Sequence, residues 1–223
     1  MTLSDKKRSA RGFTLLCLLV GLLSAENLMA EPARFQVRVL DQHQQPVADA
    51  IVIDPDIPAA ATPPDIAVMD QQNKQFKPHV LAITRGQKVT FPNSDNIRHH
   101  VYSFSEAKRF EIRLYADTPE APIEFERGGV VVLGCNIHDS MLGYIFVSDW
   151  QHFAQTDAQG IATFNAMTSA PKKLAVWHPE QGDPTRIQTI ETVTWDAANT
   201  ATITLQRQPK AAPVKSSRFR YGS

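Results

Sequence analysis

The stretch "LGCNIHDSMLGYIFV", residues 133–147, places three potential metal ligands on one short segment between two apolar runs. Cys135, His138 and Met141 follow one another at intervals of three residues. The flanking runs are rich in β-branched and aromatic residues, which is typical of buried strands. We therefore expect a loop between two strands that presents a thiolate, an imidazole and a thioether together.

The ligand types on this segment favour copper over other metals. Calcium, magnesium and manganese prefer oxygen ligands, and structural zinc sites rarely include methionine. A blue (type 1) copper centre uses two histidines and one cysteine with a weak axial methionine. A second histidine is therefore needed. The segment "FPNSDNIRHHVYSF", residues 91–104, supplies His99 and His100 at the start of an expected strand.

Short alternating strands dominate the chain, and helical periodicity is scarce, so the fold class expected is all-β. Residues 35–40 and 50–53 form two early strands in this interpretation. Strands follow densely from residue 66 to 149, and a second set occupies residues 150–206. The proline- and alanine-rich segment "DPDIPAAATPPD", residues 54–65, is typical of a linker.

Two segments indicate how these strands are buried. In "RFEIRLY", residues 109–115, Phe110, Ile112 and Leu114 alternate with charged residues, which predicts a strand with one covered face. The segment "VVVLG", residues 130–134, is continuously apolar, as expected of a central strand covered on both faces.

Two separated motifs resemble the cupredoxin family over about residues 66–149. The pattern "F.P….V..G..V.F.N.D….H.V", ending in "C..H..M.G.I.V", is similar to that of amicyanin- and plastocyanin-like proteins, and the "CNIHDSM" loop matches the amicyanin type. The resemblance implies a Greek-key sandwich of about eight strands with one type 1 copper at one end. The implied ligands are His99, Cys135, His138 and Met141.

The same resemblance distinguishes the two adjacent histidines. In the family the first ligand histidine precedes an asparagine that ties the two ligand loops together by hydrogen bonds. His100 stands at the position of that asparagine, so the resemblance makes His99 the ligand and His100 an outer contact that orients it. Chains of this appearance are often labelled methylamine-utilisation-like, which is an association by family.

A second resemblance concerns the strands outside this region. "RVLDQHQQPVADAIV", residues 38–52, together with "FAQTDAQGIATF", residues 153–164, resembles the carboxypeptidase-regulatory-like (transthyretin-like) sandwich, an immunoglobulin-like architecture. We expect residues 31–61 and 150–206 to form one discontinuous sandwich, with the cupredoxin domain, residues 62–149, inserted in it. Domains in series are the alternative.

The inserted arrangement makes a packing prediction. The apolar residues of the early strands are expected to pack against those of the late strands. The early set is Val37, Val39, Ile51 and Ile53, and the late set is Phe153, Phe164, Leu174 and Val176.

The first thirty residues are typical of a secretory signal peptide, which predicts a periplasmic or otherwise exported protein. A basic "KKRSAR" precedes the apolar "FTLLCLLVGLL", and small residues lead to a cleavage site after Ala30. An uncleaved anchor is the alternative. After cleavage we expect no integral membrane segment. Cys17 would leave with the signal peptide, so Cys135 would be the remaining cysteine.

The distribution of charge argues against nucleic acid as a partner and distinguishes the C-terminal residues 207–223 from the rest of the chain. The chain carries 23 basic and 23 acidic residues, and residues 207–223 are basic and rich in proline and serine, which is typical of a disordered tail. The body between leader and tail is therefore acidic and gives no reason to expect nucleic-acid binding.

We interpret the chain as a carrier of single electrons, not an enzyme, that docks transiently with redox proteins around Met141, Leu142 and the exposed edge of His138. A copper-delivery or partner-recognition module is the alternative. A multicopper oxidase would need H-x-H pairs, which the sequence lacks. A cysteine hydrolase would need Asp139 to orient His138 from the neighbouring position, which loop geometry rarely allows. The other histidines, His43, His79, His152 and His178, are expected to be structural.

Overall fold

The computed structural model describes residues 33–59, 65–119, 121–167 and 169–208. These residues form strands and turns without a helix, which confirms the all-β fold class. Accordingly, the described part of the chain holds no helix of the length and hydropathy needed to cross a bilayer. The expected signal peptide, residues 1–30, lies outside the described residues, as does the tail beyond residue 208.

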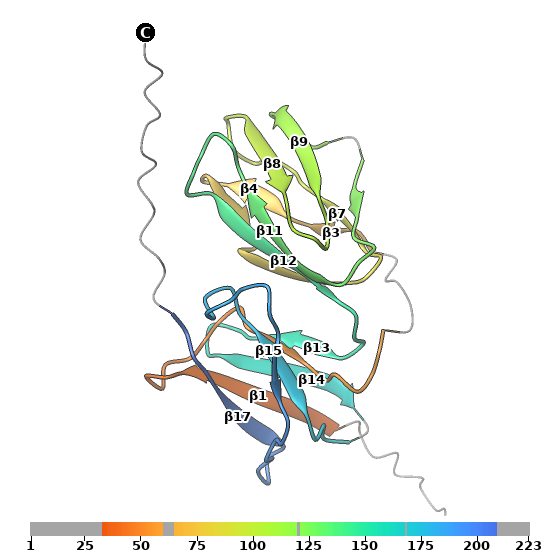
Figure 1. The fold of residues 1–223 in the computed structure, drawn as a ribbon, viewed down its shortest axis with the longest axis vertical. Coiled ribbons are helices and arrows are strands. Elements are labelled where there is room, and N and C mark those ends of the chain that lie inside the picture. Colours follow the sequence, from red (N-terminus) through yellow and green to blue (C-terminus); the bar gives the residue numbers. More distant parts are fainter. Residues whose placement is uncertain (1–32, 60–64, 120, 168, 209–223) are drawn as a thin grey trace, which may run out of the picture. The chain divides into compact units, whose positions relative to one another are not determined.

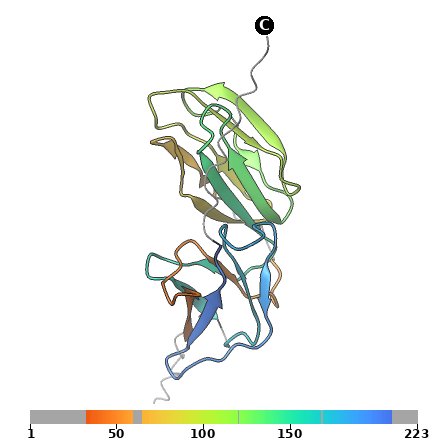
Figure 2. The ribbon, with the colours of Figure 1, turned by 60° about the vertical axis from the view of Figure 1, so that its left-hand side comes forward.

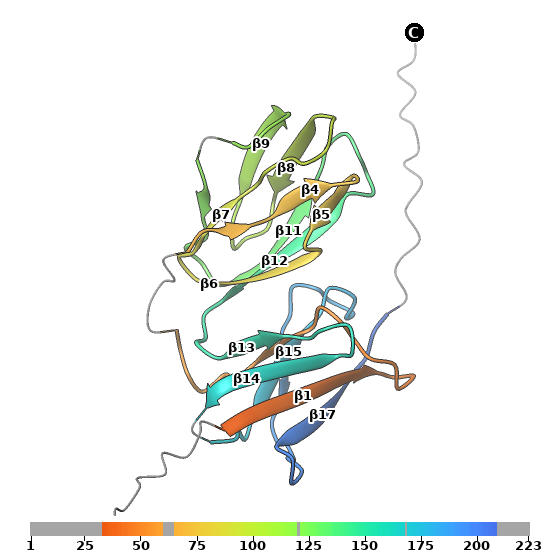
Figure 3. The same cartoon turned by 180° about the vertical axis from the view of Figure 1, so that it is seen from behind.

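Residues 67–148 form two sheets and a hairpin. Their strands are β3 (Ala67–Val68), β4 (Asp70–Gln72), β5 (Gln75–Lys77), β6 (Val80–Thr84), β7 (Lys88–Thr90), β8 (His99–Ser103), β9 (Phe110–Tyr115), β10 (Ile123–Glu124), β11 (Gly129–Gly134) and β12 (Leu142–Ser148). One sheet has the order β6-β12-β11-β8-β9 and the other has the order β10-β7-β3, while β4 and β5 pair with each other (Figures 1 and 3). β6 pairs with β12 in parallel, which requires a crossover connection.

These strands enclose an apolar core, and burial of such surface is the main stabilising term of a fold. Its buried members are Met69, Phe76, Ile83, Val89, Phe91, Val101, Phe125, Val131, Leu133, Cys135, Met141, Ile145 and Val147. Two of the predicted ligands, Cys135 and Met141, are therefore also core residues.

Strand alternation explains why Cys135 points inward. Val131, Leu133 and Cys135 are spaced two residues apart and share this core, because side chains of a strand alternate between its faces. Val130 lies on the opposite face, in a different buried cluster. β11 is therefore covered on both faces, as its continuous apolar sequence predicts.

The remaining strands form two further sheets. They are β1 (Ala33–Asp41), β2 (Ile51–Ile53), β13 (Phe153–Gln155), β14 (Ile161–Met167), β15 (Leu174–Trp177), β16 (Gln188–Ile190) and β17 (Thr200–Leu205). The sheet orders are β14-β1-β17 and β13-β2-β15-β16. The early strand β1, red in Figures 2 and 3, thus lies beside the late strand β17, drawn in blue.

Each of these sheets has an early strand at its centre. β1 pairs antiparallel with β14 and parallel with β17, although more than a hundred residues separate it from both. β2 likewise lies between two late strands, β13 and β15, and pairs antiparallel with both. Their shared core contains Phe35, Val37, Val39, Val47, Ala50, Val52, Ala162, Phe164, Met167, Leu174, Val176, Ile203 and Leu205. The likeness of these sheets to the carboxypeptidase-regulatory-like family stays a prediction.

A third buried cluster separates Ile51 and Ile53 from Phe164, Leu174 and Val176, although Phe153 packs against it as predicted. The two isoleucines do not join Val37 and Val39 but lie in a cluster with Trp177. That cluster also contains Val80, Val130, Tyr144 and Phe146, from the five-stranded sheet. The reason is the strand period of two: Val52 fills the core with β1, so its neighbours on β2 face the opposite side.

Candidate metal centre

Three predicted ligands come from two parts of the chain and meet at one place. Cys135 directly follows β11 and is 3% exposed. His99 is the first residue of β8 and is fully buried. His138 lies on the connection from β11 to β12 and is half-buried. The connection is closed by a hydrogen bond of 2.9 Å from the N–H of Met141 to the carbonyl oxygen of His138.

The ligand atoms of these three residues converge. The Sγ atom of Cys135 is 3.8 Å from Nδ1 of His99 and 3.6 Å from Nδ1 of His138. The three donor atoms all lie within 4.8 Å of one another. A nitrogen and a thiolate sulfur on one ion, at about 2.0 and 2.3 Å from it, lie about 3.5–3.7 Å apart at tetrahedral or trigonal angles. The residues therefore fit a shared metal ion.

Met141 lies in the same buried core as Cys135 and is 2% exposed. A thioether in this position suits a weak axial ligand, because it is soft and shielded from water. Its role as the fourth ligand stays a prediction. Burial has a second consequence, since Met141 contributes almost nothing to the surface around His138.

The ring of His100 has different surroundings from that of His99. Its Nε2 atom is 2.9 Å from Oε1 of Glu111 on the neighbouring strand β9. Its ring packs against Tyr102, with 5.6 Å between the ring centroids. These contacts fix the His100 ring between Glu111 on β9 and Tyr102 on β8. Its expected role as an outer contact of the ligands stays a prediction.

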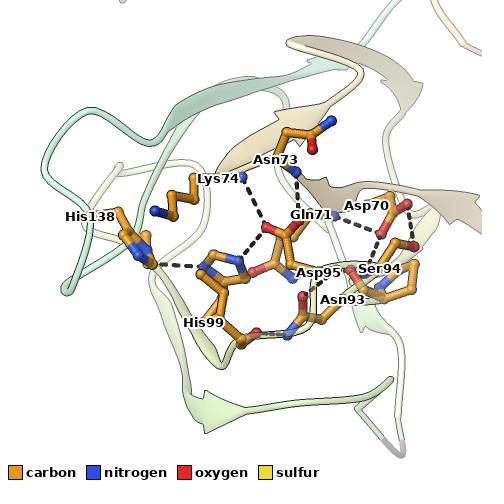
Figure 4. A network of polar contacts seen from close by, with 12 residues as sticks. Asp70, Gln71, Asn73, Lys74, Asn93, Ser94, Asp95, His99 and His138 are labelled. Atoms are coloured by element: carbon orange, nitrogen blue, oxygen red, sulfur yellow. Dashed lines mark hydrogen bonds and ion pairs between the residues drawn. The ribbon is translucent and has the colours of Figure 1, made fainter.

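The carboxylate of Asp95 contacts the predicted ligand His99, and the sequence analysis did not predict this contact. Its Oδ2 atom is 2.7 Å from Nε2 of His99, on the side of the ring opposite Cys135. Figure 4 shows Asp95 between His99 and the backbone of Asn73 and Lys74. The available signal was an acidic residue four positions before His99, in "DNIRH", residues 95–99.

The surroundings keep Asp95 charged. Burial alone would raise the pKa of the Asp95 carboxyl, but hydrogen bonds from the Lys74 N–H, His99 and the Asn73 N–H outweigh it. The pKa therefore lies below its ordinary value, and the group is a carboxylate at neutral pH.

The surroundings keep His138 neutral. Partial burial lowers the pKa of His138, and the nearby His99 and Lys74 lower it further against the opposing charge of Asp95. A neutral imidazole has a free lone pair, which is the form that binds metal.

An open depression adjoins His138. It is lined by Asn73, Lys74, Asp95, Asn96, Ile97, Arg98, Ile137 and His138. Ile97 and Ile137 are 36% and 48% exposed, and Leu142 at the start of β12 is 40% exposed. Apolar side chains with this exposure are available for contact with another molecule.

The other histidines lie outside this group. His178 is buried, and its Nδ1 accepts a hydrogen bond from the N–H of Glu180. His79 packs edge-on against Tyr144, and His152 faces Asp54 at 3.9 Å. His43 is exposed.

No family model and no curated protein sequence matches the chain. Several solved structures resemble part of it. A copper-containing nitrite reductase from Thermus scotoductus SA-01 is 26% identical over 52% of this chain and 28% of its own, with a TM-score of 0.37. A purple cupredoxin from Nitrosopumilus maritimus is 24% identical over 37% of this chain and 98% of its own, with a TM-score of 0.32.

An amicyanin variant in the reduced Cu(I) form is 19% identical over 44% of this chain and 98% of its own, with a TM-score of 0.34. The chain thus spans less than a third of the length of the nitrite reductase. Since all these TM-scores are below 0.5, the function proposed below rests on the chain's own residues.

Proposed function

We propose that this chain is an exported cupredoxin that binds one type 1 copper ion and carries single electrons. The ligands are His99, Cys135, His138 and Met141. The observation that carries the proposal is that Nδ1 of both histidines faces the buried Cys135 thiol, at 3.8 and 3.6 Å. Export rests on the signal peptide expected from residues 1–30.

Each ligand side chain has a distinct task. Bound copper supplies a one-electron change of oxidation state. Cys135 provides a thiolate from inside the core, and coordination keeps such a thiol deprotonated. His99 is fully buried and held from both sides of its ring, so it anchors the site. His138 is half-buried and provides the edge through which an electron passes to a partner.

The same geometry disfavours the alternatives. Exchange of copper in delivery favours ligands that can swing away, whereas His99 is locked between Asp95 and Cys135. A hydrolase would need Cys135 to be reachable by substrate, but the thiol is 3% exposed. Asp139, the third group of that hypothesis, is exposed to solvent.

Titration with Cu(II) tests the proposal. The purified protein is expected to develop an intense visible thiolate-to-copper absorption that saturates at one equivalent. Cys135→Ser is expected to remove it, since the hydroxyl is a poor soft ligand. Visible absorption spectroscopy and copper analysis measure both. A colourless complex, or preferential binding of zinc, would contradict the proposal.

We also propose that redox partners dock at the depression beside His138 and are acidic there. Lys74 and Arg98 are exposed at this depression, and the structure shows no ion pair for either among the described residues. Its carboxylate, Asp95, is turned inward to His99. A surface with two free cations next to the electron's exit attracts a negatively charged partner.

The rate of oxidation by a small anionic oxidant reports the charge of this surface and does not require the natural partner to be known. Oxidation of the reduced protein by hexacyanoferrate(III) is expected to slow with added salt, because salt screens the attraction. Arg98→Glu is expected to lower the low-salt rate by about tenfold or more. Arg113→Glu is the matched control, since Arg113 is 90% exposed on β9 and does not line the depression. Equal rates in the two variants would contradict an acidic partner.

A further inference from the structure

We propose that Asp95 is a positioning residue for the metal centre. Its carboxylate fixes which nitrogen of His99 carries the proton and strengthens the other nitrogen as a ligand. The effect on copper rests on the proposed function, whereas the effect on the His99 ring does not. Asp95 is the aspartate of the cupredoxin-like pattern in residues 89–101, but that pattern by itself gave it no role.

The contact defines the form of the His99 ring. A neutral imidazole carries one N–H donor and one acceptor nitrogen. A carboxylate only accepts, so the Nε2 atom, 2.7 Å from Oδ2 of Asp95, carries the proton and donates it. The lone pair is then left on Nδ1, which is the atom that faces Cys135. In the metal-free protein, Nε2 is therefore the hydrogen-bond donor and Nδ1 is the atom free to bind metal.

Asp95 is itself held in place by the backbone. Its Oδ1 accepts a hydrogen bond of 2.6 Å from the N–H of Asn73, and Oδ2 accepts one of 2.9 Å from the N–H of Lys74. The N–H of Asp95 donates to Oδ1 of Asn93 at 3.1 Å. The carboxylate therefore has little freedom to turn away from His99 (Figure 4).

The turn that supplies these donors has an unusual backbone. Asn73 and Lys74, between β4 and β5, have φ angles of 55° and 56°. Residues other than glycine uncommonly adopt this left-handed backbone conformation. Two such residues in succession are typical of a type I′ turn. Here the turn aims two consecutive N–H groups at one carboxylate. Such strained backbone is commonly kept where a functional group is held.

The Asp95–His99 contact has an electronic consequence. A carboxylate that accepts from one ring nitrogen raises the donor strength of the other, as in the carboxylate–histidine pairs of other metal sites. A stronger nitrogen donor stabilises the more highly charged Cu(II) more than Cu(I). Asp95 should thus lower the reduction potential of the centre.

Asp95→Asn tests this consequence, because it removes the charge and keeps the size. Cu(II) is expected to bind 10–100-fold more weakly, the usual effect of losing such a contact. Cu(I) affinity is expected to change less, and a tenfold difference between the two losses raises the potential by about 59 mV. Competition titrations and direct voltammetry measure these quantities.

Glu111→Gln is the matched control. It removes a carboxylate from an equivalent histidine pair, His100 with Glu111 at 2.9 Å, which is not part of the ligand cluster. It is expected to leave copper affinity and potential unchanged. Equal effects of the two substitutions would overturn the proposal, because they would reflect only a general loss of negative charge.

The metal-free wild-type protein gives a test that depends neither on copper nor on a variant. Nitrogen chemical shifts of the His99 ring, measured by NMR, are expected to show a protonated Nε2 and an unprotonated Nδ1. A ring with the proton on Nδ1 would overturn the proposal. If the ring has the expected form but copper does not bind, the proposed function fails and the positioning role of Asp95 stands.

Discussion

His99→Ala is expected to abolish the intense visible absorption of the Cu(II)-loaded protein, whereas His100→Ala is expected to keep it. Only His99 places a ring nitrogen 3.8 Å from the Cys135 thiol, and it is fully buried beside it. Without it, two strong ligands remain, and water enters a site that needs three. The loss of Cu(II) affinity should exceed the 10–100-fold that follows removal of an outer contact.

His100→Ala serves as the control for this prediction. The two residues are adjacent and both buried, so the substitutions remove similar volumes from the same strand. His100→Ala breaks the contacts with Glu111 and Tyr102, which should lower thermal stability but not remove a ligand. Absorption spectra and unfolding curves of both variants separate these effects. Loss of the visible band in His100→Ala alone would mean that the ligand is misassigned by one residue.

A fragment of residues 150–208 is expected to lack a cooperative unfolding transition. Removal of residues 33–53 takes the central strand from both of its sheets, β1 from between β14 and β17, and β2 from between β13 and β15. Six buried core residues are lost with it, namely Phe35, Val37, Val39, Val47, Ala50 and Val52. The whole stability of a typical domain, about 5–15 kcal/mol, is less than such a loss.

Calorimetry and circular dichroism of the fragment measure this expectation, with the full-length protein as reference. Addition of a peptide of residues 33–59 should restore strand signal, because it returns the two missing strands to their partners. The same peptide with Val37→Asp and Val39→Asp is the matched control, since both valines are fully buried in the core. A cooperative transition of the fragment alone would show that residues 150–208 form a domain in series.

Strand identity could be predicted from the sequence more reliably than strand register. The alternation in residues 109–115 indicated that Phe110, Ile112 and Leu114 share a covered face. Phe110 and Ile112 do pack against the core, but Leu114 is 48% exposed and Tyr115 packs there instead. The pairing of β8 with β9 shifts register between His99 and Val101. Such a bulge reverses the faces beyond it, and hydrophobic alternation alone does not reveal it.

Tyr115 shows what the shifted register achieves. Its hydroxyl donates a hydrogen bond of 2.8 Å to the carbonyl oxygen of Phe91, and the side chain of Gln71 donates to the hydroxyl. Burial raises the pKa of Tyr115 to about 12, so the hydroxyl keeps its proton as a donor. Its own carbonyl accepts from Asn93, the residue that also accepts from the N–H of Asp95.

The sequence by itself determined the strand-rich fold class and the set of chemical groups at residues 135–141, because these depend on local alternation and on spacing along the chain. Resemblance to known families led to the expectation that His99 joins Cys135 and that early and late strands share one sandwich. The distances between the donor atoms, the contact of Asp95 with His99 and the pairing of β1 and β2 with particular late strands were decided by the tertiary structure. His99 and Cys135 are 36 positions apart, and β1 lies more than 100 positions from β17. The orientation of Asp95 depends on the turn between β4 and β5. The geometry of these contacts follows from strand pairing and packing, which local sequence patterns do not encode.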